Sequence, residues 1–211
     1  MGILETVVWR VDANSPDPAV LAEAGALIRQ GRLVAFPTET VYGLGANALD
    51  AAAVSALFAA KRRPAHNPLI LHLAAAEQVF PYVREVPALG VKLIEAFWPG
   101  PLTLVFFNSG KLPPVVTGGL PIIAVRVPAH PVALGIIRAA EVPVVAPSAN
   151  LSGRPSPTTA AHVLADLRGR IDAVVDGGPT PLGIESTVLD LTGKVPRVLR
   201  RGAVSSSEIG R

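Results

Sequence analysis

The sequence predicts an α/β domain with an open, twisted, mixed sheet flanked by helices, and two observations lead to this prediction. Short apolar runs typical of buried strands alternate with amphipathic helical segments through most of the chain. Near the C-terminus, three strand-like runs follow one another with no long helix between them: Ala173–Asp176, Thr187–Leu191 and Arg197–Leu199. Strands that first alternate with helices and then cluster favour a mixed sheet over a purely parallel one.

The chain length and the composition narrow the possible classes of protein. A chain of 211 residues fits one domain, and we expect its core at about 15–203 and a short tail at 204–211. The chain has no cysteine, so disulfides, thiolate zinc sites and cysteine nucleophiles are excluded. We predict no metal ligands in the protein, and neither zinc nor haem as a cofactor.

Charge and hydropathy give expectations about location. The net charge of +3 is too small to require a nucleic-acid partner. The N-terminus lacks the cationic start and long apolar core of a signal peptide. No apolar run approaches the roughly 20 residues that span a bilayer. We therefore expect a cytoplasmic protein with no membrane partner.

The first third of the chain predicts three strands and two helices. Ser15 followed by Pro16 is typical of a helix start, and Asp50 can cap the second helix. Apolar runs predict strands that are covered on both faces. The expected elements are strands at Thr6–Trp9, Leu33–Phe36 and Leu69–Leu73, and helices at Pro16–Gln30 and Ala51–Ala60.

The remainder predicts further helices, strands and two irregular segments. Trp98–Pro101 contains two prolines and a glycine and predicts a turn, and Asn108–Pro121 predicts a loop. Ser205–Ser207 is consistent with a frayed chain end. The expected helices are Ala75–Val83, Pro87–Phe97, Pro131–Ala140 and Thr158 or Thr159 to Leu167, and the expected strands besides the last three are Leu102–Phe107, Ile122–Val127 and Val142–Ala146.

Several well-known catalytic motifs do not fit this sequence. Gly43–Ala48 matches the pattern G-x-G-x-x-A, but its glycines do not directly follow the strand, and three cations stand about 20 residues later where an acid is needed. Phosphate loops, zinc-protease motifs and nucleophile elbows are absent from the sequence. The sequence therefore predicts neither a Rossmann site nor a covalent intermediate.

Cationic residues give the clearest indication of a binding site. Arg126 interrupts an apolar strand, and a buried guanidinium must be paired or face a cavity, because an unpaired one is very costly. It is the best carboxylate clamp in the chain. Lys61-Arg62-Arg63 at a helix end is by itself typical of a solvated C-terminus. Because Pro64 stops the helix and the chain soon returns into a strand, one or two of these cations can turn inward.

For each of five polar residues, the sequence allows both a structural role and a role in binding a ligand. His72, inside an apolar strand, fits a satisfied buried histidine as well as a ligand contact. Thr40, like Thr38, stands close after Pro37, where threonine commonly forms turns. Ser148 and Asn150 follow an apolar strand, and they can cap a turn or contact a ligand beyond the strand end. Ser156 precedes a helix, so it can be a plain cap or lie beside a phosphate.

Four segments, in this order, closely resemble the YrdC-like threonylcarbamoyl-AMP synthase family: Pro37–Leu44 (PTETVYGL), Lys61–Leu69 (K-x-R-P-x-x-N-P-L), Ser148–Asn150 and Glu185–Val188. The resemblance runs from about Gly31 to Gly202. It implies a YrdC-like fold with a concave basic face. It also implies an enzyme that forms threonylcarbamoyl-AMP and pyrophosphate from L-threonine, bicarbonate or CO2, and ATP, with Mg2+ arriving on the ATP. The product would pass to a tRNA threonylcarbamoyl transferase complex.

The resemblance also implies residue roles. Lys61 and Arg63 would act on the phosphates, with Arg62 exposed. Arg201 stands where the family usually has proline, which leaves open whether Arg200 or Arg201 reaches the site. Ile122 stands where many relatives carry threonine, so any side-chain contact to ATP there is lost. The implied ATP contacts are Lys61, Arg63, Asn67, Ser148, Asn150, Ser156 and Arg200, and the implied threonine contacts are Thr40, His72, Arg126, Ala146 and Ser186.

Three other functions are compatible with such a domain. A protein that binds double-stranded RNA or tRNA without turnover would show salt-sensitive RNA affinity. A carbamoyl transferase of the hydrogenase-maturation type normally has a much longer chain with zinc-binding and acylphosphatase segments. A nucleotide-binding domain without turnover is disfavoured by the presence of Lys61, Arg63 and Ser148.

Overall fold

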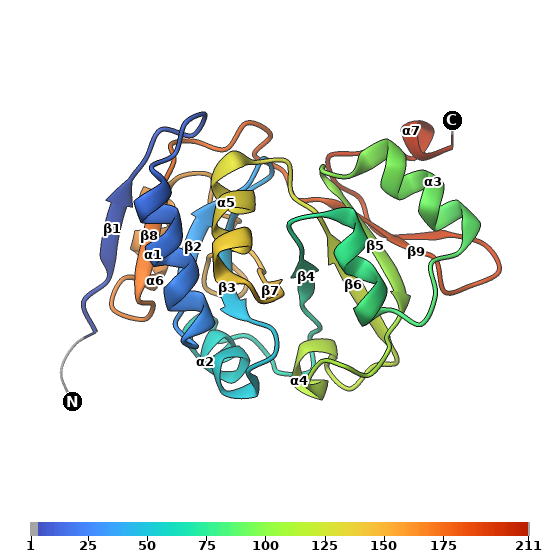
Figure 1. Cartoon of the computed structure of the whole chain (residues 1–211), viewed down its shortest axis with the longest axis horizontal. Helices are drawn as coiled ribbons and strands as arrows, with labels where there is room; N and C mark the ends of the chain where they lie inside the picture. The colour runs from blue at the N-terminus through green and yellow to red at the C-terminus, as the bar shows by residue number, and fades with distance from the viewer. Residues whose placement is uncertain (1–3, 211) are drawn as a thin grey trace.

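The architecture is a single twisted mixed sheet with helices on both faces, as the strand pattern predicts. The computed structural model describes residues 4–210, and within them ten strands form one sheet in the order β1-β8-β2-β3-β7-β4-β6-β5-β9-β10 (Figure 1). Parallel pairs (β1/β8, β2/β8, β4/β6, β5/β9) occur beside antiparallel ones (β2/β3, β3/β7, β4/β7, β5/β6, β9/β10). The prediction of a mixed sheet is confirmed.

The strands and helices have the following bounds. The strands are β1 (Val7–Arg10), β2 (Val34–Pro37), β3 (Tyr42–Asn47), β4 (Ile70–His72), β5 (Leu102–Phe107), β6 (Ile122–Arg126), β7 (Val144–Val145), β8 (Ala173–Asp176), β9 (Thr187–Asp190) and β10 (Arg197–Arg200). The helices are α1 (Pro18–Arg29), α2 (Ala51–Lys61), the 3₁₀ helix η1 (Ala76–Tyr82), α3 (Ala88–Phe97), α4 (Pro114–Thr117), α5 (Pro131–Ala140), α6 (Ala160–Leu167) and α7 (Ser206–Ile209). Among residues 4–210, none of these helices has the length and apolar character needed to cross a membrane.

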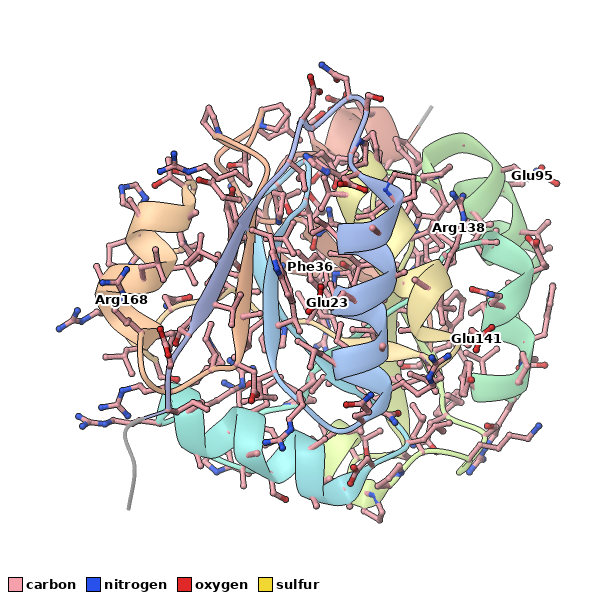
Figure 2. The ribbon with its side chains drawn as sticks, turned by 60° about the vertical axis from the view of Figure 1, so that its left-hand side comes forward. Glu23, Phe36, Glu95, Arg138, Glu141 and Arg168 are labelled. Atoms are coloured by element: carbon pink, nitrogen blue, oxygen red, sulfur yellow. The ribbon has the colours of Figure 1, made fainter. Side chains whose placement is uncertain are left out.

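The wholly apolar strands are explained by two cores, one on each face of the sheet. Alternate residues of a strand point to opposite faces, so Val34 and Phe36 of β2 join one core and Leu33 and Ala35 join the other. Helices α1 and α5 lie side by side over the first face, while α2 and α6 contribute to the second core (Figure 1). Figure 2 shows Phe36 inside the molecule, with charged side chains such as Glu95 and Arg168 at its periphery.

One strand, β3, was missed because its sequence does not look like a strand. The segment reads YGLGAN, yet its first four residues pair with β2, from Val34 opposite Gly45 to Pro37 opposite Tyr42, and its last two pair with β7. A Cβ on Gly45 would lie 2.6 Å from Cε1 of Phe36, so only glycine fits there. The two glycines therefore belong to a buried hairpin, in agreement with the rejection of a dinucleotide loop.

Smaller differences also have local causes. The first helix begins at Pro18, not at Ser15-Pro16, because the Asp17 side chain accepts a hydrogen bond from the amide of Ala19. The predicted helix at 75–83 is the 3₁₀ helix η1, which contains Pro81, a residue with no N–H for an α-helical bond.

The remaining differences concern short elements. The predicted loop at 108–121 contains the short helix α4, and the strand predicted at 142–146 pairs only over β7. The segment expected to fray forms α7, whose Ser205 accepts a hydrogen bond from the amide of Glu208. Ile209 packs against the core beside it.

The contact between α1 and α5 gives a first prediction. A Cβ on Gly25 would lie 2.6 Å from backbone atoms of Ala139 and Ala140, whereas one on Gly135 would meet only Cδ1 of Leu21, the end of a flexible side chain, at 2.4 Å. Alanine favours a helix over glycine by about 1 kcal/mol. We expect Gly25→Ala to lower the free energy of unfolding by about 1–3 kcal/mol, because α1 must move away from α5. Gly135→Ala should change it little.

Urea denaturation of both variants tests this prediction. A destabilisation of Gly135→Ala as large as that of Gly25→Ala would contradict it, because the backbone contact at Gly25 would then not be the tighter one.

Candidate active site

A cavity of about 290 Å³ lies at the centre of the sheet and collects most of the predicted site residues. Its wall includes residues from the β2–β3 turn, from β4, β6 and β10, and from the segments that follow α2 and β7 and precede β9. Nine of the predicted residues line it: Thr40, Arg63, Asn67, His72, Arg126, Ala146, Ser148, Ser186 and Arg200. The fold thus brings together residues from the whole length of the chain.

Strand register explains how one end of the cavity forms. Strands β4 and β6 are parallel neighbours, and His72 is the register partner of Arg126. On the other side of β4, the amide of Ala146 donates to the carbonyl of Ile70 at 3.2 Å. Two apolar strands thus carry His72 and Arg126 to the same place, with Ala146 beside them.

His72 is a neutral hydrogen-bond acceptor toward the cavity. Its Nδ1 lies 3.1 Å from the carbonyl oxygen of Ile70, and because a carbonyl can only accept, the proton must be on Nδ1. Burial, reinforced by the charge of Arg126, lowers the pKa of His72 to about 3. Its Nε2 is therefore unprotonated near neutral pH and can accept a hydrogen bond from an amine or a hydroxyl group.

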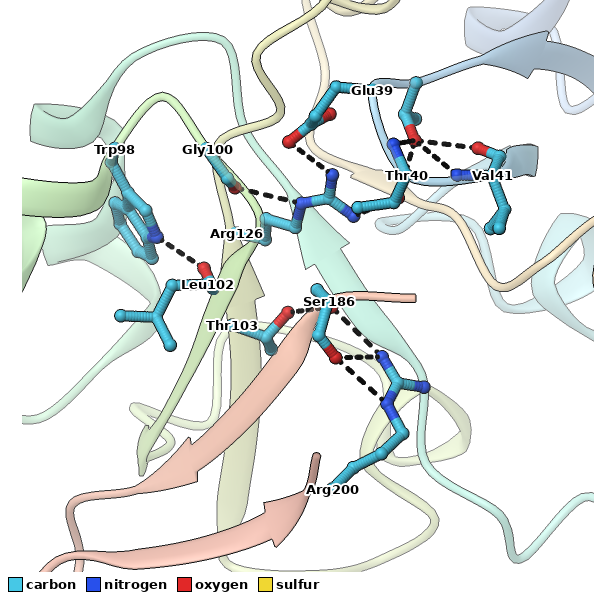
Figure 3. Close-up of polar contacts among 11 residues, drawn as sticks. Glu39, Thr40, Val41, Trp98, Gly100, Leu102, Thr103, Arg126, Ser186 and Arg200 are labelled. Atoms are coloured by element: carbon cyan, nitrogen blue, oxygen red, sulfur yellow. Dashed lines mark hydrogen bonds and ion pairs between the residues drawn. The ribbon is translucent and has the colours of Figure 1, made fainter. Parts of the chain in front are cut away.

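Arg126 is held by three groups of the protein (Figure 3). Its NH2 lies 2.6 Å from Oε1 of Glu39, its NH1 donates to Oγ1 of Thr40 at 3.0 Å, and its Nε donates to the carbonyl of Gly100 at 3.2 Å. The sequence predicted that this arginine is paired or faces a cavity, and the structure has both. Burial lowers the pKa of Arg126, and the Glu39 carboxylate acts in the opposite direction.

Arginines from two other segments also line the cavity, Arg63 after α2 and Arg200 in β10. Helix α2 ends at Lys61, and Arg62 adopts a left-handed conformation with φ 52° that reverses the chain direction. Arg62 is exposed, as predicted, and Arg63 turns back to donate to the carbonyls of Asn67 at 3.4 Å and Pro68 at 3.0 Å.

Arg200, not Arg201, lines the cavity. A register shift in the β9/β10 pair between Val198 and Arg200 sets the direction of its side chain. Its guanidinium donates to the carbonyl of Ser186 at 2.9 Å and to the Ser186 hydroxyl at 3.0 Å (Figure 3). It also pairs with Glu185. Arg201 is exposed.

Three predicted residues stand behind the cavity wall. Lys61 is buried, and its Nζ donates to the carbonyls of Ser148 and Asn150, the latter at 2.6 Å. The Asn150 amide donates to the carbonyl of Arg154 at 2.8 Å, and the Ser156 hydroxyl donates to Glu185 at 2.5 Å. Lys61 therefore holds the Ser148 segment, and its phosphate contact stays a prediction.

The sequence reasoning gave no role to two carboxylates. Glu185 lines the cavity and accepts from both Ser156 and Arg200, while Glu39 pairs with Arg126 behind it. The sequence holds only a weak signal for Glu39, an acid inside the Pro37–Leu44 segment, and nothing in it pairs Glu39 with Arg126. Within residues 4–210, no group of three or more His, Asp or Glu side chains could hold a metal ion.

The buried amine of Lys61 gives a second prediction. Burial, together with the charge of Arg63, lowers the pKa of Lys61 from 10.5 to about 8. Between these pH values the unfolded chain holds the proton more tightly than the folded chain, so this residue makes stability rise as the pH rises. Relative to a Lys61→Met variant, the wild-type free energy of unfolding should increase between pH 8 and pH 10.5.

Urea unfolding of both proteins at several pH values measures this difference, and titrations of other groups cancel in the comparison. Parallel pH curves for the two proteins would show that Lys61 keeps its ordinary pKa in the folded state.

Comparisons with known proteins show which proteins this chain is similar to. A threonylcarbamoyl-AMP synthase of Pyrococcus abyssi is 55% identical over 186 residues, covering 88% of this chain and 55% of the relative. One of Bacillus subtilis is 48% identical over 211 residues, covering 98% of this chain and 61% of the relative. The structure of P. abyssi Sua5 complexed with L-threonine superposes with a TM-score of 0.94 at 51% identity, over 97% of this chain and 60% of that one.

These relatives are longer proteins, and this chain spans somewhat more than half of their length. The family described as telomere recombination, which groups the Sua5, YciO and YrdC proteins, matches residues 26–202. That match includes all the residues named above as lining the cavity. The chain belongs to the Sua5/YciO/YrdC family.

Proposed function

We propose that this chain joins L-threonine, bicarbonate or CO2, and ATP into threonylcarbamoyl-AMP and pyrophosphate, the activity for which its closely similar relatives are named. The observation that carries the proposal is a single cavity lined by one buried arginine, Arg126, and by two further arginines, Arg63 and Arg200. Such a cavity suits a ligand with a carboxylate and a phosphate held side by side.

Three residues of the cavity wall support threonine as the substrate: Arg126, His72 and Ser186. Arg126 can bind the carboxylate, and Nε2 of His72 can accept a hydrogen bond from the amine or the hydroxyl. The Ser186 hydroxyl lies 2.8 Å from the hydroxyl of the fully buried Thr103, which fixes its position. The structure of the P. abyssi protein with L-threonine supports this assignment.

Two further arginines of the cavity wall support ATP as the second substrate. Arg63 and Arg200 would offset negative charge on the phosphates, and Ser148 would contact the nucleotide. Lys61 would act through the Ser148 segment that it holds. Glu185 is the one carboxylate that lines the cavity within the described residues, and its oxygens already accept from Ser156 and Arg200. The residues present form no metal cage, so we assign no step to a metal, and any Mg2+ would come with the ATP.

The proposed reaction depends on holding the two reactants close together and not on a reactive protein side chain. The threonine amine loses a proton and adds CO2 to give a carbamate, an oxygen of the carbamate then attacks the α-phosphorus of ATP, and pyrophosphate leaves. Holding the carbamate against the phosphate in a shared cavity can lower such a barrier by several kcal/mol, roughly 7–11 kcal/mol in the best cases. The neutral His72 leaves the amine free of a competing positive charge on that side.

The product fits a role in tRNA modification, since a tRNA threonylcarbamoyl transferase would consume it in the cytoplasm. The main alternative is a protein that binds tRNA or double-stranded RNA without turnover. The alternative does not require a buried carboxylate clamp, because RNA phosphates are contacted at the surface. The buried position of Arg126 therefore favours the enzyme.

The proposed reaction predicts pyrophosphate release that depends on every substrate. Pyrophosphate should form from ATP when L-threonine and bicarbonate are present, and its rate should fall to background when either is omitted. Turnover that does not depend on threonine would rule out this reaction, and salt-sensitive RNA binding without any turnover would favour the alternative.

Arg126→Lys tests the carboxylate clamp, because lysine keeps a positive charge beside the buried carboxylate of Glu39. Lysine keeps the positive charge but loses the planar fork that binds a carboxylate through two donors. We expect the KM for threonine to rise roughly tenfold or more, with the KM for ATP nearly unchanged. Arg138→Lys, on the exposed face of α5, is the matched control. An equal rise in both KM values would indicate a general distortion of the cavity.

A further inference from the structure

Glu39 is a buried carboxylate for which the proposed reaction gives no role. It lies in the turn between β2 and β3, is 7% exposed, and does not line the cavity. Its Oε1 is 2.6 Å from NH2 of Arg126, and the side chains of the pair are 10% and 5% exposed. Because Arg126 lines the cavity and Glu39 does not, the carboxylate reaches the guanidinium from the side away from the cavity.

The contacts of Arg126 leave part of its guanidinium free for a ligand. Of the five N–H groups of an arginine, Nε–H and one on NH1 are hydrogen-bonded to Gly100 and Thr40. NH2 is buried in the ion pair with Glu39, which can take one of its two N–H groups. One N–H on NH1 and one on NH2 are thus left without a partner among these contacts, and a ligand carboxylate at the cavity wall can accept from both.

Stability alone does not explain this pair. A buried ion pair often contributes no more than well-packed apolar side chains of the same size would, because removing two charges from water offsets their attraction. Oε2 of Glu39 is also buried without a hydrogen-bond partner among the described residues, so the pair is not optimised as a structural contact. What the ion pair does provide is a fixed orientation of the Arg126 guanidinium.

We propose that Glu39 is a positioning residue, which holds the guanidinium of Arg126 from behind so that NH2 stays directed at the carboxylate of the amino-acid substrate. The inference rests on the proposed function and deepens it, because it explains why the clamp is preformed. Thr40 and Gly100 contact two nitrogens of the planar guanidinium, and Glu39 contacts the third, so the orientation of the whole group is held at three points.

Two substitutions separate positioning from electrostatic competition. Glu39→Gln keeps an acceptor oxygen at the same place, whereas Glu39→Ala removes both the charge and the acceptor. If Glu39 positions Arg126, Glu39→Ala should raise the KM for threonine at least tenfold, and Glu39→Gln should restore it to within about threefold of wild type. If Glu39 only competes with the substrate carboxylate for Arg126, both variants should lower that KM.

The experiment measures the KM for threonine and for ATP by pyrophosphate release, with the unfolding temperature of each variant as a check on folding. Glu141→Gln is the matched control, because it removes the charge of another carboxylate paired with an arginine, at an exposed site. A selective rise of the threonine KM in Glu39→Ala, with recovery in Glu39→Gln, is the expected result.

Other outcomes overturn the proposal in distinguishable ways. If Glu39→Ala does not fold, the Glu39→Gln variant provides the test. A KM for threonine of this variant below that of wild type would exclude a positioning role for Glu39. Equal changes in both KM values, or no change, exclude it as well. If wild type itself releases no pyrophosphate with threonine, the proposed function fails, whereas a working wild type with unaffected Glu39 variants removes only the role of Glu39.

Discussion

The site depends on one buried positive charge, the guanidinium of Arg126. A charge of this kind is tolerated in the interior only where oxygen atoms replace the lost water. Two segments supply them: the β2–β3 turn through Glu39 and Thr40, and the turn before β5 through Gly100. The same contacts connect these segments to the end of β6. The arginine thus helps to assemble the cavity in which we propose that it binds a carboxylate.

The order of the strands explains where the cations of the cavity come from. Adjacent strands β4 and β6 bring His72 and Arg126 together as buried register partners. Arg63, in the segment after α2, and Arg200, on the edge strand β10, also line the cavity. Ligands in open sheets commonly sit beyond strand ends, and a rigid recognition site next to a charged phosphate site fits the joining of an amino acid to a nucleotide.

Residue types predicted much of the candidate site, but not how its members contact one another. An arginine inside an apolar strand had to be paired or face a cavity, so Arg126 could be identified from elementary electrostatics. Its partner Glu39 could not, because nothing in the sequence states which of the acids comes within 2.6 Å. Lys61 was predicted to face phosphates, yet burial turns its amine toward the carbonyls of the Ser148 segment.

The sequence by itself determined the fold class and most of its elements, because apolar runs and helix caps are local signals that a short segment carries alone. It did not determine β3, whose glycines have no strand preference and become a strand only by pairing with β2. Tertiary structure alone decided that Arg200 rather than Arg201 lines the cavity, through a register shift between β9 and β10. Strand partners and side-chain directions depend on contacts with residues far away in the chain, and a local sequence pattern does not show which distant residues will come into contact.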